Sequence, residues 1–119
     1  MSEEFKRIAR QEVNEDIAEI GNLLQNCNSD ESMHIKASDI EKHVHKIKGL
    51  APMMGQEEIG QIAALLDKLL KVALSGKSVP GMIQTIKNSH LFMKNTMDGT
   101  VQNYDSLVSQ IKSDHKDIL

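Results

Sequence analysis

The sequence contains very few aromatic residues. Of its 119 residues two are Phe, one is Tyr and none is Trp, so aromatic side chains make up only 3% of the chain. An apolar core must therefore be built mainly from Leu, Ile, Val, Ala and Met, within a hydrophobic content of 39%. Because β-sandwiches usually draw on β-branched and aromatic strands, this composition favours packed helices.

Cysteine and long apolar runs are also scarce. Cys27 is the single cysteine, which excludes an intramolecular disulfide and is typical of a reducing compartment. Residues 1–7 carry charges where a signal peptide would need an apolar stretch, and no run approaches the length that crosses a bilayer. We therefore expect a cytoplasmic protein with no membrane segment, or a cytoplasmic module of a larger protein.

Basic residues are not in excess over acidic ones. The chain has 14 Lys and Arg against 17 Asp and Glu, which gives a formal net charge of -3. This balance provides no basic surface for a phosphate backbone, so nucleic acid is not an expected partner. The length is that of one domain with a single core, and residues 1–119 are expected to form it.

Five segments carry apolar residues at the alternating spacing of three and four that is typical of helices, and no segment has a convincing strand pattern. We expect helices over about residues 3–26, 33–54, 56–75, 80–98 and 101–118, with Pro52 producing a kink or lying in the final turn of the second. Short connections make successive helices antiparallel. The predicted fold is all-α, an antiparallel up-and-down four-helix bundle with an additional C-terminal fifth helix.

His45 is set off the apolar face of the second helical segment. Lys48 lies one turn later on the same polar face, and Gly49 follows four residues after the histidine. An imidazole titrates near neutral pH and offers an unprotonated nitrogen as a nucleophile. Lys48 would neutralise a negative group on the ring, and Gly49 would leave bare backbone for the approach of another protein. The pattern indicates a histidine that carries a phosphoryl group in the open, although an exposed structural histidine is the simpler interpretation.

The run from His45 to Gly55, HKIKGLAPMMG, resembles the signature of histidine phosphotransfer (HPt) domains of two-component phosphorelays. Its part from Lys48 onward is most similar to the N-terminal phosphotransfer domain of chemotaxis-type histidine kinases, which also has a fifth helix. The resemblance implies that His45 accepts a phosphoryl group from the ATP-binding domain of a histidine kinase, or from a receiver aspartate. His45 then passes the phosphoryl group to a response-regulator receiver domain. The closer similarity to chemotaxis-type kinases implies that this transfer belongs to chemotaxis signalling. ATP and Mg²⁺ would be bound by those partners, and no cofactor or metal is expected in this chain.

Asp67 is a second candidate, 22 positions after His45 on the third segment. If the second and third helices pack antiparallel about Gly55, Asp67 comes near His45. A carboxylate that accepts a hydrogen bond from the inner ring nitrogen would fix the tautomer and orient the imidazole. The resemblance implies a glutamate at this place, so the shorter side chain leaves a bridging water as one alternative and a solvated surface aspartate as another.

The other histidines are interpreted structurally. His43 is expected on the surface, and it points away from His45, so the two cannot hold one metal ion. His90 and His115 lie on or near apolar stripes and are expected to be partly buried.

An adaptor that binds signalling partners without carrying phosphate is the alternative function. If it functions in histidine phosphotransfer, the chain is a phosphocarrier rather than a complete enzyme, and the isolated domain is expected to be a monomer. The sequence leaves open whether residues 1–119 are a whole protein or the N-terminal part of a larger kinase, to whose activity they would then contribute.

Overall fold

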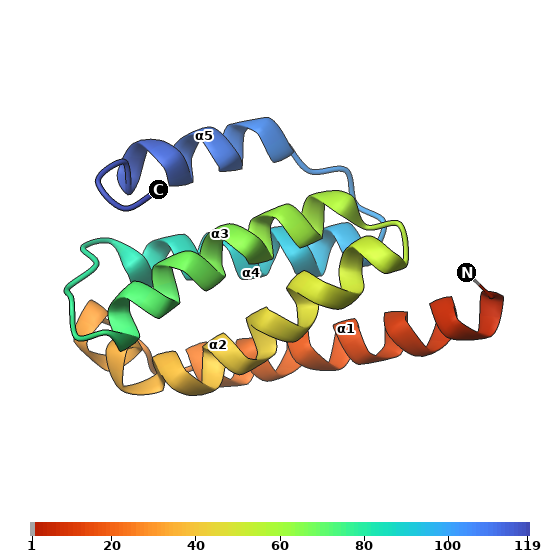
Figure 1. Cartoon of the computed structure of the whole chain (residues 1–119), viewed down its shortest axis with the longest axis horizontal. Helices are drawn as coiled ribbons and strands as arrows, with labels where there is room; N and C mark the ends of the chain where they lie inside the picture. The colour runs from red at the N-terminus through yellow and green to blue at the C-terminus, as the bar shows by residue number, and fades with distance from the viewer. Residues whose placement is uncertain (1) are drawn as a thin grey trace.

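The computed structural model describes residues 2–119, which form five α-helices (Figure 1). In chain order they are α1 (Glu3–Leu24), α2 (Asp30–Met53), α3 (Glu57–Leu74), α4 (Met82–Met97) and α5 (Tyr104–Asp114). These described residues contain no β-strand. The prediction of an all-helical chain with five helices is confirmed.

The predicted helix boundaries were wrong mainly where side chains cap the backbone. α2 begins at Asp30, three residues before the predicted start, because Ser29 and Ser32 form a reciprocal capping box at its first turn. α5 is shorter at both ends than the predicted 101–118. The Asn103 side chain accepts a hydrogen bond from the backbone N–H of Ser106 and sets the start of α5, whereas apolar spacing alone suggested an earlier one.

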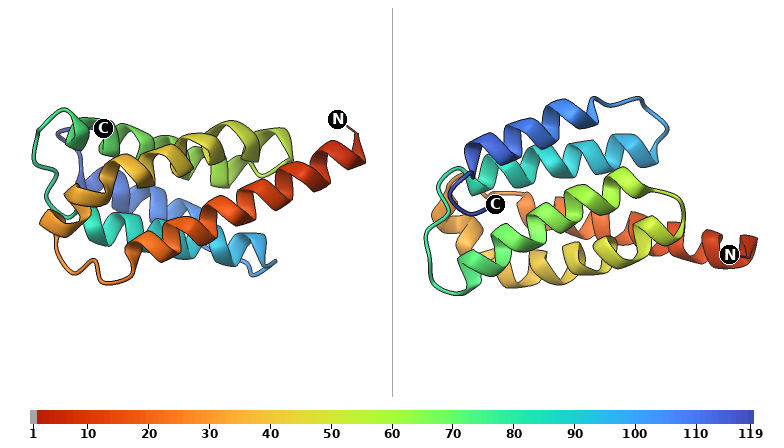
Figure 2. Two further views of the ribbon diagram at one scale, coloured as in Figure 1. Left: turned by 90° about the horizontal axis from the view of Figure 1, so that it is seen from below. Right: turned by 45° about the horizontal axis from the view of Figure 1, so that its top comes forward.

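The first four helices lie side by side along the long axis of the molecule, and the chain reverses direction from each to the next (Figure 1). α2 packs against α1 and α3, and α4 also contacts α1 and α3. α5 lies outside this group against α4 and α3 (Figure 2). Both flanks of α2 are therefore covered by a neighbouring helix, α1 on one side and α3 on the other.

The core between these helices is almost entirely aliphatic. Its fully buried side chains are mainly Ile, Leu, Val, Ala and Met, and Phe92 is the one aromatic residue among the buried hydrophobics of residues 2–119. On α2 the buried positions recur at intervals of three and four: Met33, Ala37, Ile40, Val44, Ile47 and Ala51. This stripe fixes the rotation of α2, so that the residues between its members face the flanking helices or water.

The turn between α2 and α3 is compact because glycines permit a close approach. Pro52 lies in the last turn of α2, and Gly55 ends the helix with a φ of +86°, in the left-handed region. Gly60 packs against the proline ring, and a Cβ at Gly60 would lie 2.5 Å from Cγ of Pro52. The register between α2 and α3 thus depends on the absence of a side chain at position 60.

Replacing Gly60 with Ala is expected to destabilise the fold by about 1–3 kcal/mol, because a rigid proline ring cannot yield to the added methyl group. Gly49 is the matched control, since it also lies within a helix but a Cβ there meets no atom within 4 Å. Gly49→Ala is expected to stabilise the fold by up to about 1 kcal/mol through helix propensity. Urea unfolding of the two variants measures both effects, and equal changes in the two would contradict this packing.

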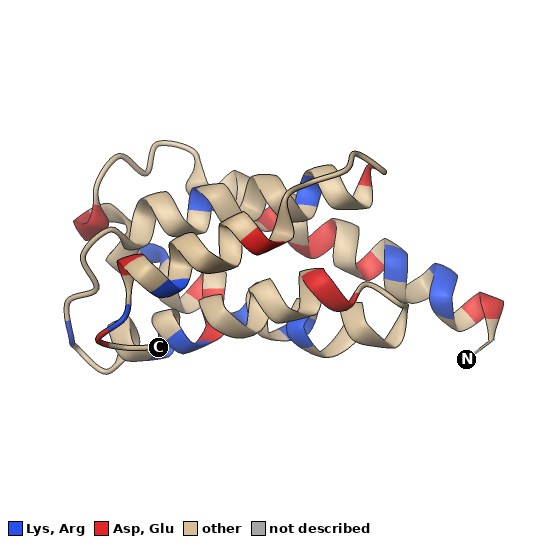
Figure 3. Cartoon of the chain, turned by 90° about the horizontal axis from the view of Figure 1, so that it is seen from above, with Lys and Arg blue, Asp and Glu red and all other residues tan. Residues whose placement is uncertain are grey.

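Charged residues are distributed over all five helices. In the view of Figure 3, acidic and basic positions are interspersed along the helices, in keeping with the small net charge. Among the described residues, 2–119, no helix combines the length and the apolar character that crossing a membrane would require.

Candidate functional site

His45 projects from α2 with 60% of its side chain exposed. Its neighbour Val44 is completely buried, and so is Ile47, so the backbone that carries the imidazole is anchored in the core while the ring is accessible. The space beside Gly49, one turn later, is open. At this position a firmly anchored backbone carries an imidazole that is open to approach from solvent.

The carboxylate of Asp67 lies beside the inner nitrogen of this ring. Nδ1 of His45 is 3.5 Å from Oδ2 of Asp67, at the outer limit of hydrogen-bond distance. The Asp67 side chain is only 2% exposed, because α3 places it in the seam with α2. The interpretation of Asp67 as a solvated surface residue was wrong. With Nδ1 facing this carboxylate, Nε2 is the nitrogen left for chemistry.

Two lysines neutralise Asp67. The Nζ atoms of Lys48 on α2 and Lys71 on α3 donate to Oδ2 at 3.1 and 2.8 Å. Burial opposes ionisation of Asp67, but the hydrogen bonds from Lys71 and Lys48 outweigh it and lower its pKa from 3.8 to about 2. The same contact raises the pKa of Lys71. Lys48 was identified from the sequence, whereas Lys71 was missed, although its position four residues after Asp67 is the spacing of a helical ion pair.

Glu41 completes the surroundings of the imidazole and was also missed. Its Oε1 lies 4.0 Å from Nδ1 of His45, one helical turn before it, and its side chain is largely buried. Burial raises the pKa of Glu41, and so do a hydrogen bond with Asp67 and the charge of Asp67. The inner side of the His45 ring is thus flanked by two carboxyl groups, of which Asp67 is the stronger acid.

Replacing Glu41 with Gln is expected to raise the free energy of unfolding at pH 7 by about 1 kcal/mol, the worth of one hydrogen bond. The raised pKa means that the folded state binds the Glu41 proton more tightly than the unfolded chain does, so the wild type loses stability as pH rises through that pKa. A glutamine amide can donate to Asp67 at any pH. Urea unfolding at pH 3.5 and pH 7 should show the gain mainly at pH 7; a larger gain at pH 3.5 would contradict it.

Glu41, His45 and Asp67 offer one ligand atom each within 4.8 Å of one another. The donor types suit a divalent cation. However, the ammonium groups of Lys48 and Lys71 already contact Oδ2 of Asp67, and a cation would have to displace both. We therefore assign no metal to this cluster.

Three of the other four histidines contact neighbouring helices. His43 was expected on the surface; its side chain is 27% exposed, and its Nδ1 lies 2.9 Å from Oδ1 of the buried Asp16 on α1, so it is only partly a surface residue. His90 was expected to be partly buried, which is confirmed: its Nε2 is 3.0 Å from the carbonyl oxygen of Ile17. His115 is buried with its Nε2 2.7 Å from Oγ1 of Thr85.

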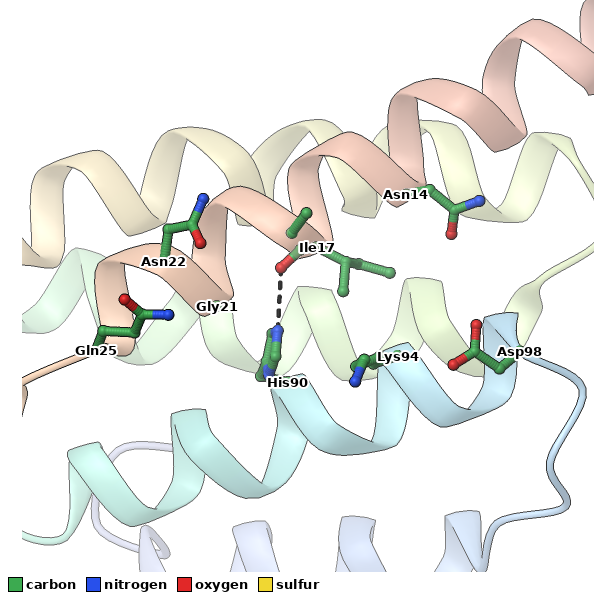
Figure 4. A pocket seen from close by; sticks show the side chains of 9 residues that line it. Asn14, Ile17, Gly21, Asn22, Gln25, His90, Lys94 and Asp98 are labelled. Atoms are coloured by element: carbon green, nitrogen blue, oxygen red, sulfur yellow. Dashed lines mark hydrogen bonds between the residues drawn. The ribbon is translucent and has the colours of Figure 1, made fainter.

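A groove of about 490 Å³ lies between α1 and α4, over His90 (Figure 4). Burial lowers the pKa of His90, and its ring fills the space left by Gly21, whose missing Cβ would lie 2.9 Å from Nε2. None of the residues that line this groove is among those around His45. The groove is therefore separate from the His45 site.

The helical architecture that carries the exposed His45 can be compared with known families. The model of the Hpt domain family matches residues 4–111. The chain belongs to the Hpt domain family. This Hpt domain therefore functions in histidine phosphotransfer within two-component signalling, which implies kinase and response-regulator partners. No curated protein and no solved structure matches the chain.

The matched part of the Hpt domain contains nearly all of α1, the whole of α2, α3 and α4, and α5 as far as Ile111. His45 and the groups around it all lie inside this range. Family membership and site geometry thus concern the same structural unit.

Proposed function

We propose that this Hpt domain carries the phosphoryl group on Nε2 of His45. The observation that supports this assignment is the exposed imidazole whose Nδ1 faces the buried carboxylate of Asp67 at 3.5 Å. That contact favours the tautomer with the proton on Nδ1 and leaves the Nε2 lone pair directed away from the protein. None of the other four histidines combines this exposure with a carboxylate on the ring.

The transfer needs no nucleotide site in this chain. Nε2 forms a bond to the γ-phosphorus of ATP held by a kinase domain, while the bond to the β,γ-bridging oxygen breaks and ADP leaves. The Nδ1 proton remains facing Asp67. In the next step a receiver aspartate attacks the same phosphorus and the N–P bond breaks, which restores the imidazole. ATP and Mg²⁺ belong to the partner domains.

The two lysines have separable roles in this proposal. Lys48 contacts Asp67 in the unphosphorylated domain but remains 42% exposed, so its ammonium can turn toward a phosphoryl group on the ring. Lys71 contacts the same oxygen and can keep Asp67 neutralised while Lys48 moves. Gly49 leaves room for the partner's backbone. The groups around His45 come from α2 and α3.

Replacing Lys48 with Met is expected to slow phosphorylation of His45 by about tenfold, because one charged hydrogen bond to the transferred group is lost. Lys71→Met is the matched control and is expected to have a smaller effect, since Lys48 can remain on Asp67. Single-turnover labelling rates with a fixed phosphoryl donor measure both. A larger effect for Lys71 than for Lys48 would contradict the separation of roles.

The narrower assignments are also part of the proposal. We place this Hpt domain with the phosphotransfer domains of chemotaxis-type kinases for two reasons. The residues from Lys48 to Gly55 resemble theirs, and a fifth helix, α5, lies outside the other four. With this assignment we also propose that the first four helices form an antiparallel bundle to which α5 is added. The domain is then cytoplasmic, and a monomer when isolated. A chemotaxis-type kinase that lacks its own phosphotransfer domain should phosphorylate this chain in trans.

Phosphoramidate, a small donor that needs no kinase, provides the test of the proposed function. Exposure to it should give an acid-labile, alkali-stable phosphoryl group on His45, located by mass spectrometry of proteolytic fragments. Addition of a purified receiver domain should then move the group to the receiver. A domain that takes up no phosphoryl group at His45 would favour the alternative, an adaptor that binds partners without carrying phosphate.

A further inference from the structure

A second histidine on α2 shares with His45 a contact to a buried aspartate of a flanking helix and a lysine three residues later. Nδ1 of His43 lies 2.9 Å from Oδ1 of Asp16, and Nζ of Lys46 lies 3.1 Å from that same oxygen. Lys46 follows His43 by three residues, as Lys48 follows His45. α2 therefore carries two overlapping His-x-x-Lys pairs, each joined to one aspartate oxygen of a flanking helix.

The two aspartates are alike in burial, and each contacts one histidine and one lysine of α2. The side chain of Asp16 on α1 is 3% exposed, close to the 2% of Asp67 on α3. In each aspartate, one carboxylate oxygen contacts both the histidine and the lysine. The other oxygen is buried and has no hydrogen-bond partner. The contact at His43 is the shorter of the two, 2.9 Å against 3.5 Å, so its tautomer is the more firmly determined.

The outer nitrogen of His43 is available for chemistry. Nε2 has no hydrogen-bond partner within residues 2–119 and is not among their buried unpartnered atoms, so water reaches it. The His43 side chain is 27% exposed against 60% for His45, and its i+4 neighbour is the buried Ile47 rather than a glycine. This nitrogen is open to a small molecule but less open to a protein.

We propose that His43 is a second phosphoryl acceptor, serving small phosphoryl donors that reach Nε2 beside the seam of α1 and α2. With phosphoramidate, whose nitrogen is already protonated in the zwitterion, Nε2 forms the bond to phosphorus while the P–N bond of the donor breaks and neutral ammonia leaves. The Nδ1 proton stays in its hydrogen bond to Asp16. The Lys46 side chain is 55% exposed and its ammonium contacts Asp16, the partner of His43, so it can turn toward the new charge. The proposal does not require that His45 be an acceptor.

The test compares phosphoramidate labelling of the wild type with that of His43→Gln, His45→Gln and the double variant. Intact mass and fragment analysis give the number and location of phosphoryl groups. We expect two groups on the wild type, one on each single variant, and on the double variant only the slow background of His34, an exposed histidine with no such contacts. Labelling at His43 is expected to exceed that at His34 by about tenfold or more, the worth of a charged hydrogen bond.

Replacing each aspartate in turn with asparagine gives a measurement that would not change if the aspartates had a purely structural role. Asp16→Asn should slow labelling of His43 by about tenfold and leave His45 unchanged, whereas Asp67→Asn should do the reverse. Label at His45 alone would overturn the second site and leave the proposed function standing. Label at His43 alone would support the second site and overturn the role of His45. A chain labelled nowhere, or at His43 no faster than at His34, would overturn the inference.

Discussion

Replacing His45 with Gln is expected to abolish passage of a phosphoryl group from a histidine kinase through this domain to a receiver. Glutamine has no nucleophilic nitrogen, and no other histidine stands beside the open backbone at Gly49, where a partner domain can approach. The measurement is the label that reaches a purified receiver from labelled ATP in a mixture of kinase, this domain and receiver. We expect it to fall to background.

His34→Gln is the matched control, because His34 is also an exposed histidine of α2 and lies about three turns from His45. Its variant should pass label at the wild-type rate. His43→Gln should also leave the kinase-driven flow intact, since small donors alone are assigned to His43. Continued flow of label through the His45 variant would contradict the assignment of the relay to His45.

Acidification is expected to remove on the order of 2 kcal/mol of stability through Asp67 alone. Its pKa is about 2 in the folded state against 3.8 in the absence of the fold, and each unit corresponds to about 1.4 kcal/mol. Because the folded-state pKa is the lower one, the stabilisation is present above about pH 4 and is lost as pH falls toward 2. Urea unfolding at successive pH values from 6 to 2 measures this loss.

Asp67→Asn provides the comparison for the acid effect. Asparagine has nearly the same shape but no charge, so its variant should be less stable than the wild type at pH 6 and should approach it at pH 2. Lys48 and Lys71 are about half exposed and can be hydrated once the carboxylate is gone, which limits the loss at pH 6. Parallel pH profiles for the two proteins would show that Asp67 is not the group that titrates.

Much of the helical framework was predictable from sequence because it depends on local periodicity. The buried stripe of α2 follows directly from apolar residues three and four apart, and the same pattern identified the other four helices. The errors at the starts of α2 and α5 came from side chains that cap backbone groups, Ser29 with Ser32 and Asn103. Such capping competes with apolar spacing over two or three residues, so spacing alone misplaces an end by about that much.

By itself the sequence singled out His45, Lys48 and Gly49, because neighbours on one helix face follow from spacing alone, and it suggested Asp67 through the antiparallel turn at Gly55. Only the tertiary structure decided that Asp67 is buried, that Lys71 and Glu41 join it, and that Asp16 pairs with His43. Those contacts depend on how deeply α1 and α3 pack against α2. A helical repeat gives the direction of a side chain; the depth and charge of its surroundings come from helices distant in sequence.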